Sequence, residues 1–457
     1  MILPNHFLAD APEIPVTREI LVETCRNLRR NRERYLAARP TEEIIALLCE
    51  VAGEWRQPEN KFRKLALADG PAATGFSRAT LARGLDALFA QFTPENFHAL
   101  LAQEFGDAAR LDKFTRADGD TKSAMVVAPE LLVHVCAGNL PNPAIMSIAF
   151  GVLLRSAQFV KCASGASWLP RLFAHSLYEA DPHLGRCLEI AEWRGGETAL
   201  EEYIFAEADC VTATGGDEAL AAIRAHVPVA KKFVGYGHRL SFGFISSEQL
   251  TEADAPQLAA RAADDVTAWD QQGCLSPHVF YIEDKGAVSA EKFAELLAGE
   301  LHRRETTEPR GEISLTEAAT IATRREIYGI RAASAPEATR VWHSADSTAW
   351  TVVFESEPRF QASCLNRFVY VKAVGAFAEV LPAVDELRGK VSTVGIAASE
   401  GKLPVLAAQL ARWGVTRICP LGQMQNPPLA WRHDGRPALG ELVTWADWEN
   451  SATDGHR

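Results

Sequence analysis

The stretch D-Q-Q-G-C-L-S-P-H, residues 270–278, is the part of the sequence that is most informative about the fold. It places Cys274 between a helical run, residues 251–269, and a strand-like run, residues 279–283. A cysteine at such a corner can be partly exposed, and nearby backbone N–H dipoles can lower its pKa. Free cysteine is also among the most buried residue types, so the local pattern leaves a nucleophile and a small buried hydrophobe equally open.

The composition is that of an ordinary globular protein. The chain has 457 residues, of which 47% are hydrophobic and 23% charged, and this length suggests two or three domains. A net charge of -12 disfavours nucleic-acid binding, and we interpret the basic cluster at residues 26–34 as the solvated face of a helix. Apolar runs stay shorter than about 18 residues, which predicts no membrane span.

The cysteine pattern bears on metal binding and on the cellular compartment. Nine cysteines are scattered without metal-ligand spacing, so the sequence predicts neither a metal site nor a disulfide framework. Free thiols suit a reducing compartment, and the N-terminus lacks a charged segment followed by a long apolar core. We therefore expect a cytoplasmic protein.

Alternating strand and helix patterns fill the middle of the chain. After helical runs over residues 16–104, residues 131–246 alternate between β and α, with one helix predicted over residues 168–180. This pattern is typical of a parallel sheet covered on both faces, which binds ligands at the carboxyl ends of its strands. Residues 246–420 repeat the α/β character, so we expect Cys274 in a cleft between two α/β units.

A small β element is predicted outside these units. Strand-like runs at residues 123–127 and 131–136 could form a hairpin across a short turn. The aromatic run L-V-T-W-A-D-W-E, residues 442–449, would add to this hairpin or pair with another subunit.

Two turns and one lysine are candidates for dinucleotide binding. Thr214, Gly215 and Gly216 precede a predicted helix whose free N–H groups could face a phosphate. Lys161 ends a strand, where its ammonium could reach ribose hydroxyls. Gly237 belongs to a G-Y-G run that begins a glycine-rich fingerprint but lacks the third glycine. Each feature alone is more often a structural turn or a surface lysine.

Three polar side chains are candidates for chemistry beside the cysteine. Asn139, in A-G-N-L-P, follows a strand and could aim its amide at a developing oxyanion, or it could simply satisfy its own turn. His278 lies four residues after Cys274, and His238 lies in G-Y-G-H-R. Either histidine could act as a base, although a lone histidine is more often structural.

Five short motifs occur in an order that is informative about the protein family. A-G-N-L-P, V-K-C-A-S, A-T-G-G, G-Y-G-H-R and Q-Q-G-C resemble the ordered motifs of the aldehyde dehydrogenase superfamily. More narrowly, G-H-R-L-S-F, W-D-Q-Q-G-C-L-S-P-H and L-G-Q-M-Q-N-P-P-L-A-W-R-H-D-G-R-P resemble the LuxC-type acyl-CoA reductases, fatty-acid reductases associated with bacterial bioluminescence. The resemblance runs from about residue 131 to the C-terminus.

The resemblance implies an α/β, aldehyde dehydrogenase-like fold. Residues 1–245 would hold the N-terminal helices and a Rossmann-like NADP-binding domain, and residues 246–420 a catalytic α/β domain. Residues 421–457 would return to the active-site cleft and end in a small β oligomerisation element.

The same resemblance assigns roles to individual residues. Cys274 would be the nucleophile that accepts the acyl group, and Asn139 with the Cys274 backbone N–H would form the oxyanion site. Lys161, Thr214 and Gly215 would lie against the dinucleotide.

Three departures from the superfamily pattern refine these expectations. Gly235 stands at or near the glutamate that activates water in hydrolytic members, so an acyl-enzyme should persist until hydride or thiol resolves it. Ser164 stands where NAD-preferring members place an acid, which favours NADPH. The glutamate of the E-I-F-G-P segment, which holds the nicotinamide ribose, has no counterpart in A-S-C-L-N-R-F.

The sequence thus predicts an NADPH-dependent reductase that converts a fatty acyl-CoA thioester to an aldehyde through acylated Cys274. The substrate would be an acyl-CoA or an acyl carrier, an acyl-activating partner enzyme is implied, and we expect a homo-oligomer. Three alternatives stay open. They are a CoA-acylating aldehyde dehydrogenase running oxidatively, a cysteine acyltransferase or thioesterase that uses His278 without nicotinamide, and a non-catalytic scaffold.

Overall fold

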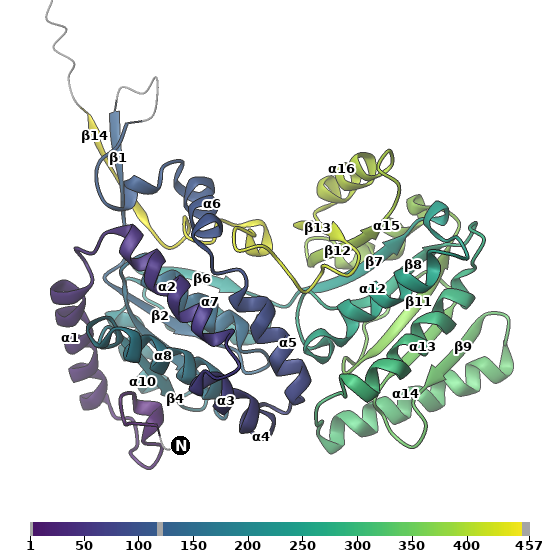
Figure 1. The fold of residues 1–457 in the computed structure, drawn as a ribbon, viewed down its shortest axis with the longest axis horizontal. Coiled ribbons are helices and arrows are strands. Elements are labelled where there is room, and N and C mark those ends of the chain that lie inside the picture. The colour runs from purple at the N-terminus through teal and green to yellow at the C-terminus, as the bar shows by residue number, and fades with distance from the viewer. Residues whose placement is uncertain (1–2, 117–121, 450–457) are drawn as a thin grey trace, which may run out of the picture.

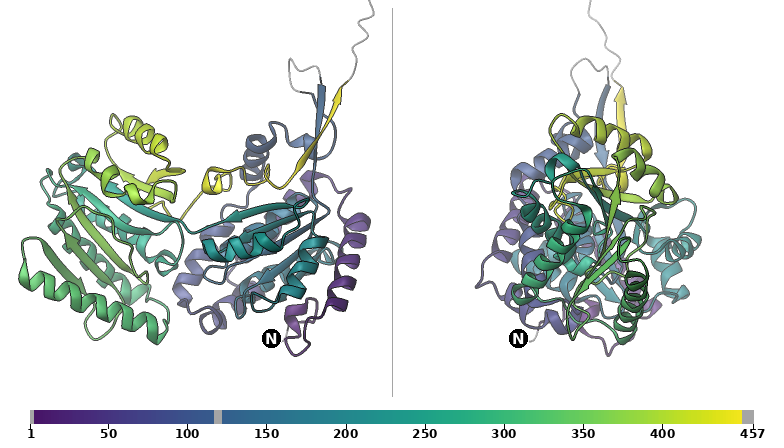
Figure 2. Two further views of the ribbon diagram at one scale, coloured as in Figure 1. Left: turned by 180° about the vertical axis from the view of Figure 1, so that it is seen from behind. Right: turned by 90° about the vertical axis from the view of Figure 1, so that its right-hand side faces the viewer.

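Two α/β lobes lie side by side in the computed structural model, which describes residues 3–116 and 122–449 (Figure 1). Helices precede the first sheet, and a C-terminal segment runs back from the second lobe to the first (Figure 2). Within the described residues, the search for a helix long and apolar enough to cross a bilayer finds none.

The N-terminal helices pack against the first lobe through apolar stripes. In α5, Leu81, Leu85 and Leu88 are buried at the spacing of one helix face. The helix begins after Ser77, whose hydroxyl accepts a hydrogen bond from the N–H of Thr80 at 3.1 Å. The helices of this region are α1 (Arg18–Tyr35), α2 (Thr41–Trp55), α3 (Lys61–Ala68), α4 (Gly70–Thr74), α5 (Arg78–Phe89) and α6 (Pro94–Phe105).

The first sheet confirms the predicted parallel α/β unit. Its five strands are all parallel, in the order β4-β3-β2-β5-β6. The central strand is buried at every position, as expected for a strand covered on both faces. The strands are β2 (Leu131–Val135), β3 (Ala157–Cys162), β4 (Leu188–Glu192), β5 (Cys210–Thr214) and β6 (Lys232–Tyr236). The helices between them are α7 (Asn142–Leu153), α8 (Trp168–Ala180), α9 (Pro182–Gly185), α10 (Thr198–Glu207) and α11 (Asp217–His226).

The predicted hairpin is wrong, but the predicted addition of the terminal strand is correct. β1 (Lys122–Val127) pairs antiparallel with β14 (Thr444–Glu449), and β2 lies in the centre of the first sheet instead. The fully buried β2 needs neighbours on both edges, whereas the partly exposed β1 is suited to a two-stranded ribbon. This β1–β14 ribbon projects from the first lobe (Figure 1).

The second sheet has seven strands in the order β13-β12-β7-β8-β11-β10-β9, and all neighbours are parallel except β9 and β10. The strands are β7 (Leu240–Ile245), β8 (Pro277–Glu283), β9 (Thr339–His343), β10 (Thr351–Glu355), β11 (Phe368–Val374), β12 (Val391–Ala397) and β13 (Arg417–Pro420). The helices are α12 (Ala255–Thr267), α13 (Ala290–Thr307), α14 (Leu315–Ser334), α15 (Val380–Ala383) and α16 (Leu403–Trp413). The chain crosses between the sheets within residues 237–239. The division of the chain at residues 245 and 420 stays a proposal.

The two lobes meet at one large aromatic contact. Trp269 follows α12 in the second lobe, yet it is buried in the apolar core of the first. A Cβ added to Gly84 of α5 would lie 2.0 Å from the Trp269 ring, so the glycine lets the indole approach the helix axis. This contact fixes the chain five residues before Cys274.

Candidate active site

A strained turn leads into the cysteine. Trp269, Asp270 and Gln271 have φ angles of 51°, 50° and 65°, in the left-handed region that costs a non-glycine residue roughly 1–2 kcal/mol. Such strain persists only where the surroundings over-determine the conformation. We call residues 268–276 the Cys loop.

A second left-handed turn holds the first. Leu365, Asn366 and Arg367 have φ angles of 64°, 56° and 64°. The guanidinium of Arg367 lies 2.7 Å from the carboxylate of Asp270, and both side chains are at most 4% exposed. In addition, the amide of Gln272 donates to Asn366 Oδ1 at 2.6 Å. The ion pair and the hydrogen bond between the two turns therefore hold the Cys loop in one conformation.

Cys274 is half-buried at the end of this loop. Ser241 of β7 donates its hydroxyl to the Cys274 carbonyl at 2.7 Å. Burial raises the pKa of the thiol to about 11, and the charge of Asp434 adds to this effect. The expected lowering of the pKa by the backbone N–H is present, as is a contribution from Arg239, but burial outweighs both. The resting sulfur is a thiol.

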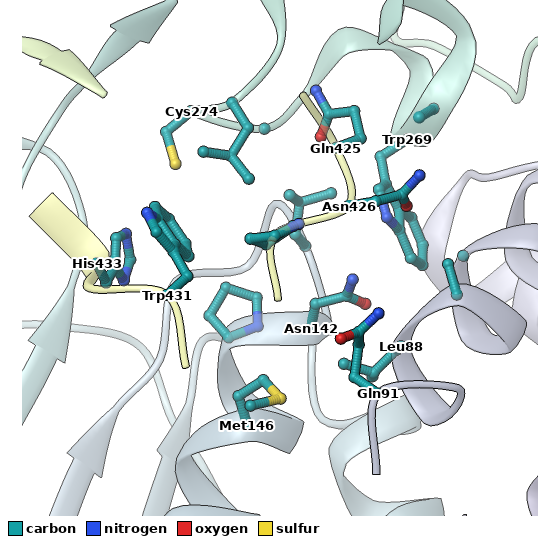
Figure 3. A pocket seen from close by; sticks show the side chains of 18 of the residues that line it. Leu88, Gln91, Asn142, Met146, Trp269, Cys274, Gln425, Asn426, Trp431 and His433 are labelled. Atoms are coloured by element: carbon teal, nitrogen blue, oxygen red, sulfur yellow. The ribbon is translucent and has the colours of Figure 1, made fainter. Parts of the chain in front are cut away.

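Cys274 lines a cavity of about 300 Å³ that both lobes and the C-terminal segment enclose (Figure 3). The walls come from α5, α7, the ends of β2, β5 and β6, the Cys loop and residues 422–442. Most lining side chains are apolar, including Leu88, Leu140, Met146, Phe150, Leu275 and Leu429. Four side-chain amides, from Gln91, Asn142, Gln425 and Asn426, also line it (Figure 3).

Buried charges pin the C-terminal segment across the cavity. Asp265 of α12 accepts hydrogen bonds from the N–H groups of Gly422 at 2.6 Å and Met424 at 2.8 Å. Arg417 donates to the carbonyls of Met424 at 2.6 Å and Gln423 at 2.7 Å. Burial raises the pKa of Asp265 to about 7 despite these hydrogen bonds. We call residues 421–443 the tail segment.

The tail segment adds an aromatic stack to the cavity wall. The ring of His433 lies between Tyr236, with centroids 4.4 Å apart, and Trp431, with centroids 4.7 Å apart. Burial lowers the pKa of His433. The resemblance predicts that this segment returns to the active-site cleft, but it gives no residue of the segment a chemical role. The only sequence signal was the polar-aromatic run W-R-H-D-G-R after two prolines.

Two predicted site residues lie next to the Cys loop. Asn139 is exposed, and its amide donates to the carbonyl of Gln272 at 3.1 Å, while its neighbour Leu140 lines the cavity. Thr214 also lines the cavity, and its hydroxyl accepts a hydrogen bond from the N–H of Ala137 at 3.0 Å. The structure thus brings the ends of β2 and β5 to the cysteine.

The predicted turn before α11 lies at the same strand ends. Gly215 donates its N–H to the carbonyl of Tyr236 at 3.2 Å. Gly216 immediately precedes α11, and a Cβ there would meet no atom within 4 Å. A Cβ at Gly237 would lie 2.7 Å from Asp217 Oδ1, so a side chain here would displace the carboxylate that accepts the N–H of His238. The backbone at the helix start is open, but the first turn of α11 also carries the carboxylates of Asp217 and Glu218, which oppose the binding of a phosphate there. The role of this turn in dinucleotide binding stays a prediction.

Lys161 and Ser164 lie at the outer end of this edge. Lys161 is buried, with its ammonium 3.9 Å from Glu201 and 5.7 Å from the ring centroid of Trp193. Ser164 is exposed, and the next residue, Gly165, donates its N–H to the Glu192 carboxylate at 2.5 Å. A ribose placed here would therefore meet an ammonium that is paired with the Glu201 carboxylate, a hydroxyl and the Glu192 carboxylate.

The two candidate histidines lie elsewhere. His278 is buried in β8, its Nδ1 accepts a hydrogen bond from the N–H of Ser363 at 3.0 Å, and burial lowers its pKa to about 4. His238 is exposed, and its backbone N–H donates to Asp217 at 3.1 Å. Neither side chain is among those that line the cavity in the described chain. Their roles as bases stay predictions. Residues 3–116 and 122–449 hold no cluster of three metal-ligating side chains.

Two α/β lobes with a cysteine between them define the class of protein. The structure superposes on an NAD-dependent benzaldehyde dehydrogenase from Corynebacterium glutamicum with a TM-score of 0.68 and 14% identity, covering 95% of this chain and 91% of the other. The chain therefore has the aldehyde dehydrogenase fold that the motifs predicted.

Sequence comparison identifies a family within the proteins that share this fold. A family profile described as acyl-CoA reductase (LuxC) matches residues 36–445, so the chain belongs to the LuxC family. It is 27% identical over 330 residues to long-chain acyl-protein thioester reductase 2 of Photobacterium leiognathi, covering 70% of this chain and 64% of that protein. It is 24% identical over 452 residues to the long-chain acyl-protein thioester reductase of Photorhabdus luminescens, covering 97% and 88%. The match to the Photobacterium protein thus spans less than two thirds of that relative.

Proposed function

We propose that the protein reduces a long-chain acyl thioester to the aldehyde through an acyl group carried on Cys274. The observation that carries this proposal is the position of the Cys274 thiol on the wall of a largely apolar cavity of about 300 Å³. Such a cavity accepts an alkyl chain and presents its thioester end to the sulfur. The related reductases are named for long-chain acyl thioesters, which agrees with this substrate class.

The first step is acyl transfer to the cysteine. The Cys274 sulfur attacks the thioester carbon, the carbonyl electron pair moves to oxygen, and the donor thiol departs with the cysteine proton. Because burial raises the pKa of Cys274 to about 11, the proton is removed during the attack and not before it. A bound nicotinamide cofactor, which the family implies, would supply the hydride that releases the acyl group as aldehyde.

Hydrolysis of the acyl group is disfavoured by the same site. Gly235, at or near the position where hydrolytic relatives carry a water-activating acid, has no side chain, and a Cβ added there would lie 2.9 Å from the Phe233 ring. The tail segment covers the cavity and limits the entry of water. The acyl-enzyme is therefore expected to persist until hydride reaches it.

The proposed acyl donor is acyl-CoA or an acyl-carrier protein, supplied by an acyl-activating partner enzyme. The related reductases are named for acyl-protein thioesters, and the chemistry at Cys274 is the same for each donor. The proposed cofactor is NADPH, because Ser164 is uncharged where an acid would repel a 2′-phosphate. The Glu192 carboxylate beside that turn opposes this preference.

We also propose a homo-oligomer that forms through the β1–β14 ribbon. Within the described chain no further strand pairs with the outer edge of β14, whereas the outer edge of β1 bonds Thr115 through Ala124. Trp445 and Trp448 of β14 are 45% and 52% exposed. Replacing Trp448 with Ser is expected to lower the mass measured by sedimentation. An unchanged mass in the variant would exclude this strand as the interface.

The test of the function is Cys274→Ser compared with Cys49→Ser, which removes another half-buried thiol that is not part of the cavity lining. Wild type and Cys49→Ser are expected to gain the mass of one acyl group from long-chain acyl-CoA and to oxidise NADPH. Cys274→Ser is expected to do neither while still binding NADPH. Aldehyde formation by Cys274→Ser would refute the proposal. Release of CoA with constant NADPH absorbance would indicate a transferase or thioesterase instead.

A further inference from the structure

One buried donor on the cavity wall has no partner. Among the described residues, four tryptophans have a buried indole N–H without a hydrogen bond, and these are Trp168, Trp193, Trp350 and Trp431. Of the four, Trp431 alone lines the cavity. A buried, unpaired N–H costs roughly 1–3 kcal/mol, so its persistence calls for an explanation.

The indole of Trp431 lies on the side of the cavity toward which the Cys274 sulfur points. Figure 3 shows the nitrogen edge of its ring directed to that side. The Trp431 backbone N–H donates to the carbonyl of Pro428 at 2.9 Å, and the His433 ring covers one side of the indole at 4.7 Å. These contacts fix the direction of the N–H.

A neighbouring cation makes this N–H a stronger donor. The Arg417 guanidinium lies 5.9 Å from the centroid of the Trp431 ring, within the range of a cation–π interaction. Its Nη atoms donate to the carbonyls of Gln423 and Met424, so the guanidinium is held in place. A cation at a ring withdraws electron density from it, and an indole N–H then carries more positive charge.

The site needs such a donor. Acyl transfer places negative charge on the carbonyl oxygen, and oxyanion donors must be fixed before that charge develops. The amide of Asn139, the predicted donor, gives one of its two N–H groups to the carbonyl of Gln272 at 3.1 Å, so only the other is left for the oxyanion, and Asn139 is exposed. Trp431 has a free N–H at the cavity wall.

We propose that the indole N–H of Trp431 donates a hydrogen bond to the acyl carbonyl oxygen as the Cys274 sulfur attacks. This inference rests on the proposed thioester chemistry. The new bond joins sulfur and carbon, and the carbonyl π pair moves to the oxygen that Trp431 holds. When that pair returns, the bond to the donor thiol breaks, and the thiol leaves with the proton of Cys274. The same contact is available when hydride adds to the acyl-enzyme.

The test is Trp431→Phe, which keeps a flat apolar ring and removes the N–H. Its matched control is Trp350→Phe, because Trp350 is also a buried indole without a partner but lies outside the cavity lining. Acylation of Cys274 by palmitoyl-CoA, a long-chain acyl thioester, is followed in a single turnover by intact mass, without cofactor. Trp431→Phe is expected to slow acylation roughly 10²–10³-fold, the usual effect of removing one oxyanion donor, and Trp350→Phe by less than about 3-fold.

A second measurement separates the donor from simple packing. Alkylation of Cys274 by iodoacetamide attacks a saturated carbon and forms no oxyanion, so Trp431→Phe is expected to leave its rate within about 2-fold. Acylation that stays within about 3-fold of wild type in Trp431→Phe would overturn the proposal. A parallel fall in acylation and alkylation would also overturn it, because it would mean a displaced sulfur.

Two further outcomes are informative. Trp431→His keeps a ring N–H, and it is expected to acylate at least 10-fold faster than Trp431→Phe, including where the phenylalanine variant folds poorly. Equal rates in these two variants would count against the donor role. Failure of the wild-type protein to acylate at all would refute the proposed function itself, and wild-type acylation with an unaffected Trp431→Phe would refute only this inference.

Discussion

The wall that the first lobe contributes to the cavity differs from the wall built by the Cys loop and the tail segment. The first consists of the ends of β2 and β5 and the face of α7 that carries Met146 and Phe150. Outside this lining, Ile145, Ile148 and Val152 of the same helix are fully buried in the core. The second is irregular chain with two left-handed turns, and buried charges hold it in place. The two walls therefore respond to different perturbations.

The stabilisation from apolar burial does not depend on pH, whereas the stabilisation from a buried ion pair requires both partners in their charged form. We call the wall built by the Cys loop and the tail segment the irregular wall. Its folded structure should be lost when a single buried charge is removed. We call the wall built by β2, β5 and α7 the regular wall. Its stability should change little when a charge at its outer edge is removed. The experiments below test that contrast, beginning with the largest effect.

Removing Arg367 should disturb the irregular wall most. Arg367→Met leaves Asp270 as a buried carboxylate without its ion-pair partner, which costs about 3–5 kcal/mol in the free energy of unfolding. The control is Arg340→Met, which breaks an exposed pair with Glu291 and should cost less than about 1 kcal/mol. Urea denaturation measures both. Equal losses in the two variants would show that the paired turns do not depend on the buried charge.

Asp265 should make the stability of the tail segment depend on pH. Its pKa is about 7 in the folded protein, above the unfolded value of about 3.9. The folded state then binds more protons than the unfolded state between about pH 4 and 7, so the free energy of unfolding falls as pH rises through that window. For Asp265→Asn, we expect this decline to be shallower by up to about 1.36 kcal/mol per pH unit, measured by urea denaturation at pH 5, 6 and 7. Parallel pH profiles for variant and wild type would contradict the raised pKa.

Asp434 of the tail segment should raise the pKa of the Cys274 thiol through its charge. Its side chain is 2% exposed, lies 3.3 Å from Arg239, and raises the pKa of Cys274 by its charge. Asp434→Asn is expected to lower the thiol pKa and to speed alkylation of Cys274 by iodoacetamide several-fold at pH 8. The exposed Asp69→Asn serves as control. An unchanged pH–rate profile in Asp434→Asn would place the carboxylate too far from the sulfur to matter.

Glu192 tests the edge of the regular wall, where the smallest effect is expected. Glu192→Gln keeps an acceptor for the N–H of Gly165 and removes the charge beside Ser164. Fluorescence titration should show the ratio of NADPH to NADH affinity rising several-fold, while the free energy of unfolding changes by less than about 0.5 kcal/mol. A falling ratio would mean that the carboxylate does not face the 2′-position.

Local patterns predicted the regular wall well. The helix expected over residues 168–180 is α8, and the parallel sheet from residue 131 is confirmed. These elements follow from apolar spacing within a few residues, and their turns follow the strand–turn–helix pattern. The nucleophile motif likewise placed Cys274 at a corner between helix and strand, where the structure has it.

Long-range pairing could not be predicted in the same way. β1 pairs with β14 more than 300 positions away, and the shorter distance to β2 favoured a hairpin that does not form. Trp431 reaches the cavity because Asp265 and Arg417 bind the backbone of the tail segment, and no local pattern reveals those hydrogen bonds. Burial reversed the expected direction of the thiol pKa for the same reason, since it depends on every element around Cys274.

The late position of the tail segment has a consequence for synthesis on the ribosome. The Cys loop is complete about 150 residues before Trp431 is added, so a nascent chain passes through a stage with its sulfur uncovered. During that stage the reactive pocket is open to solvent, and an acyl group taken up early would lack protection. The cavity is therefore complete only when the tail segment has been translated. Chains that end before this segment should not reduce an acyl thioester.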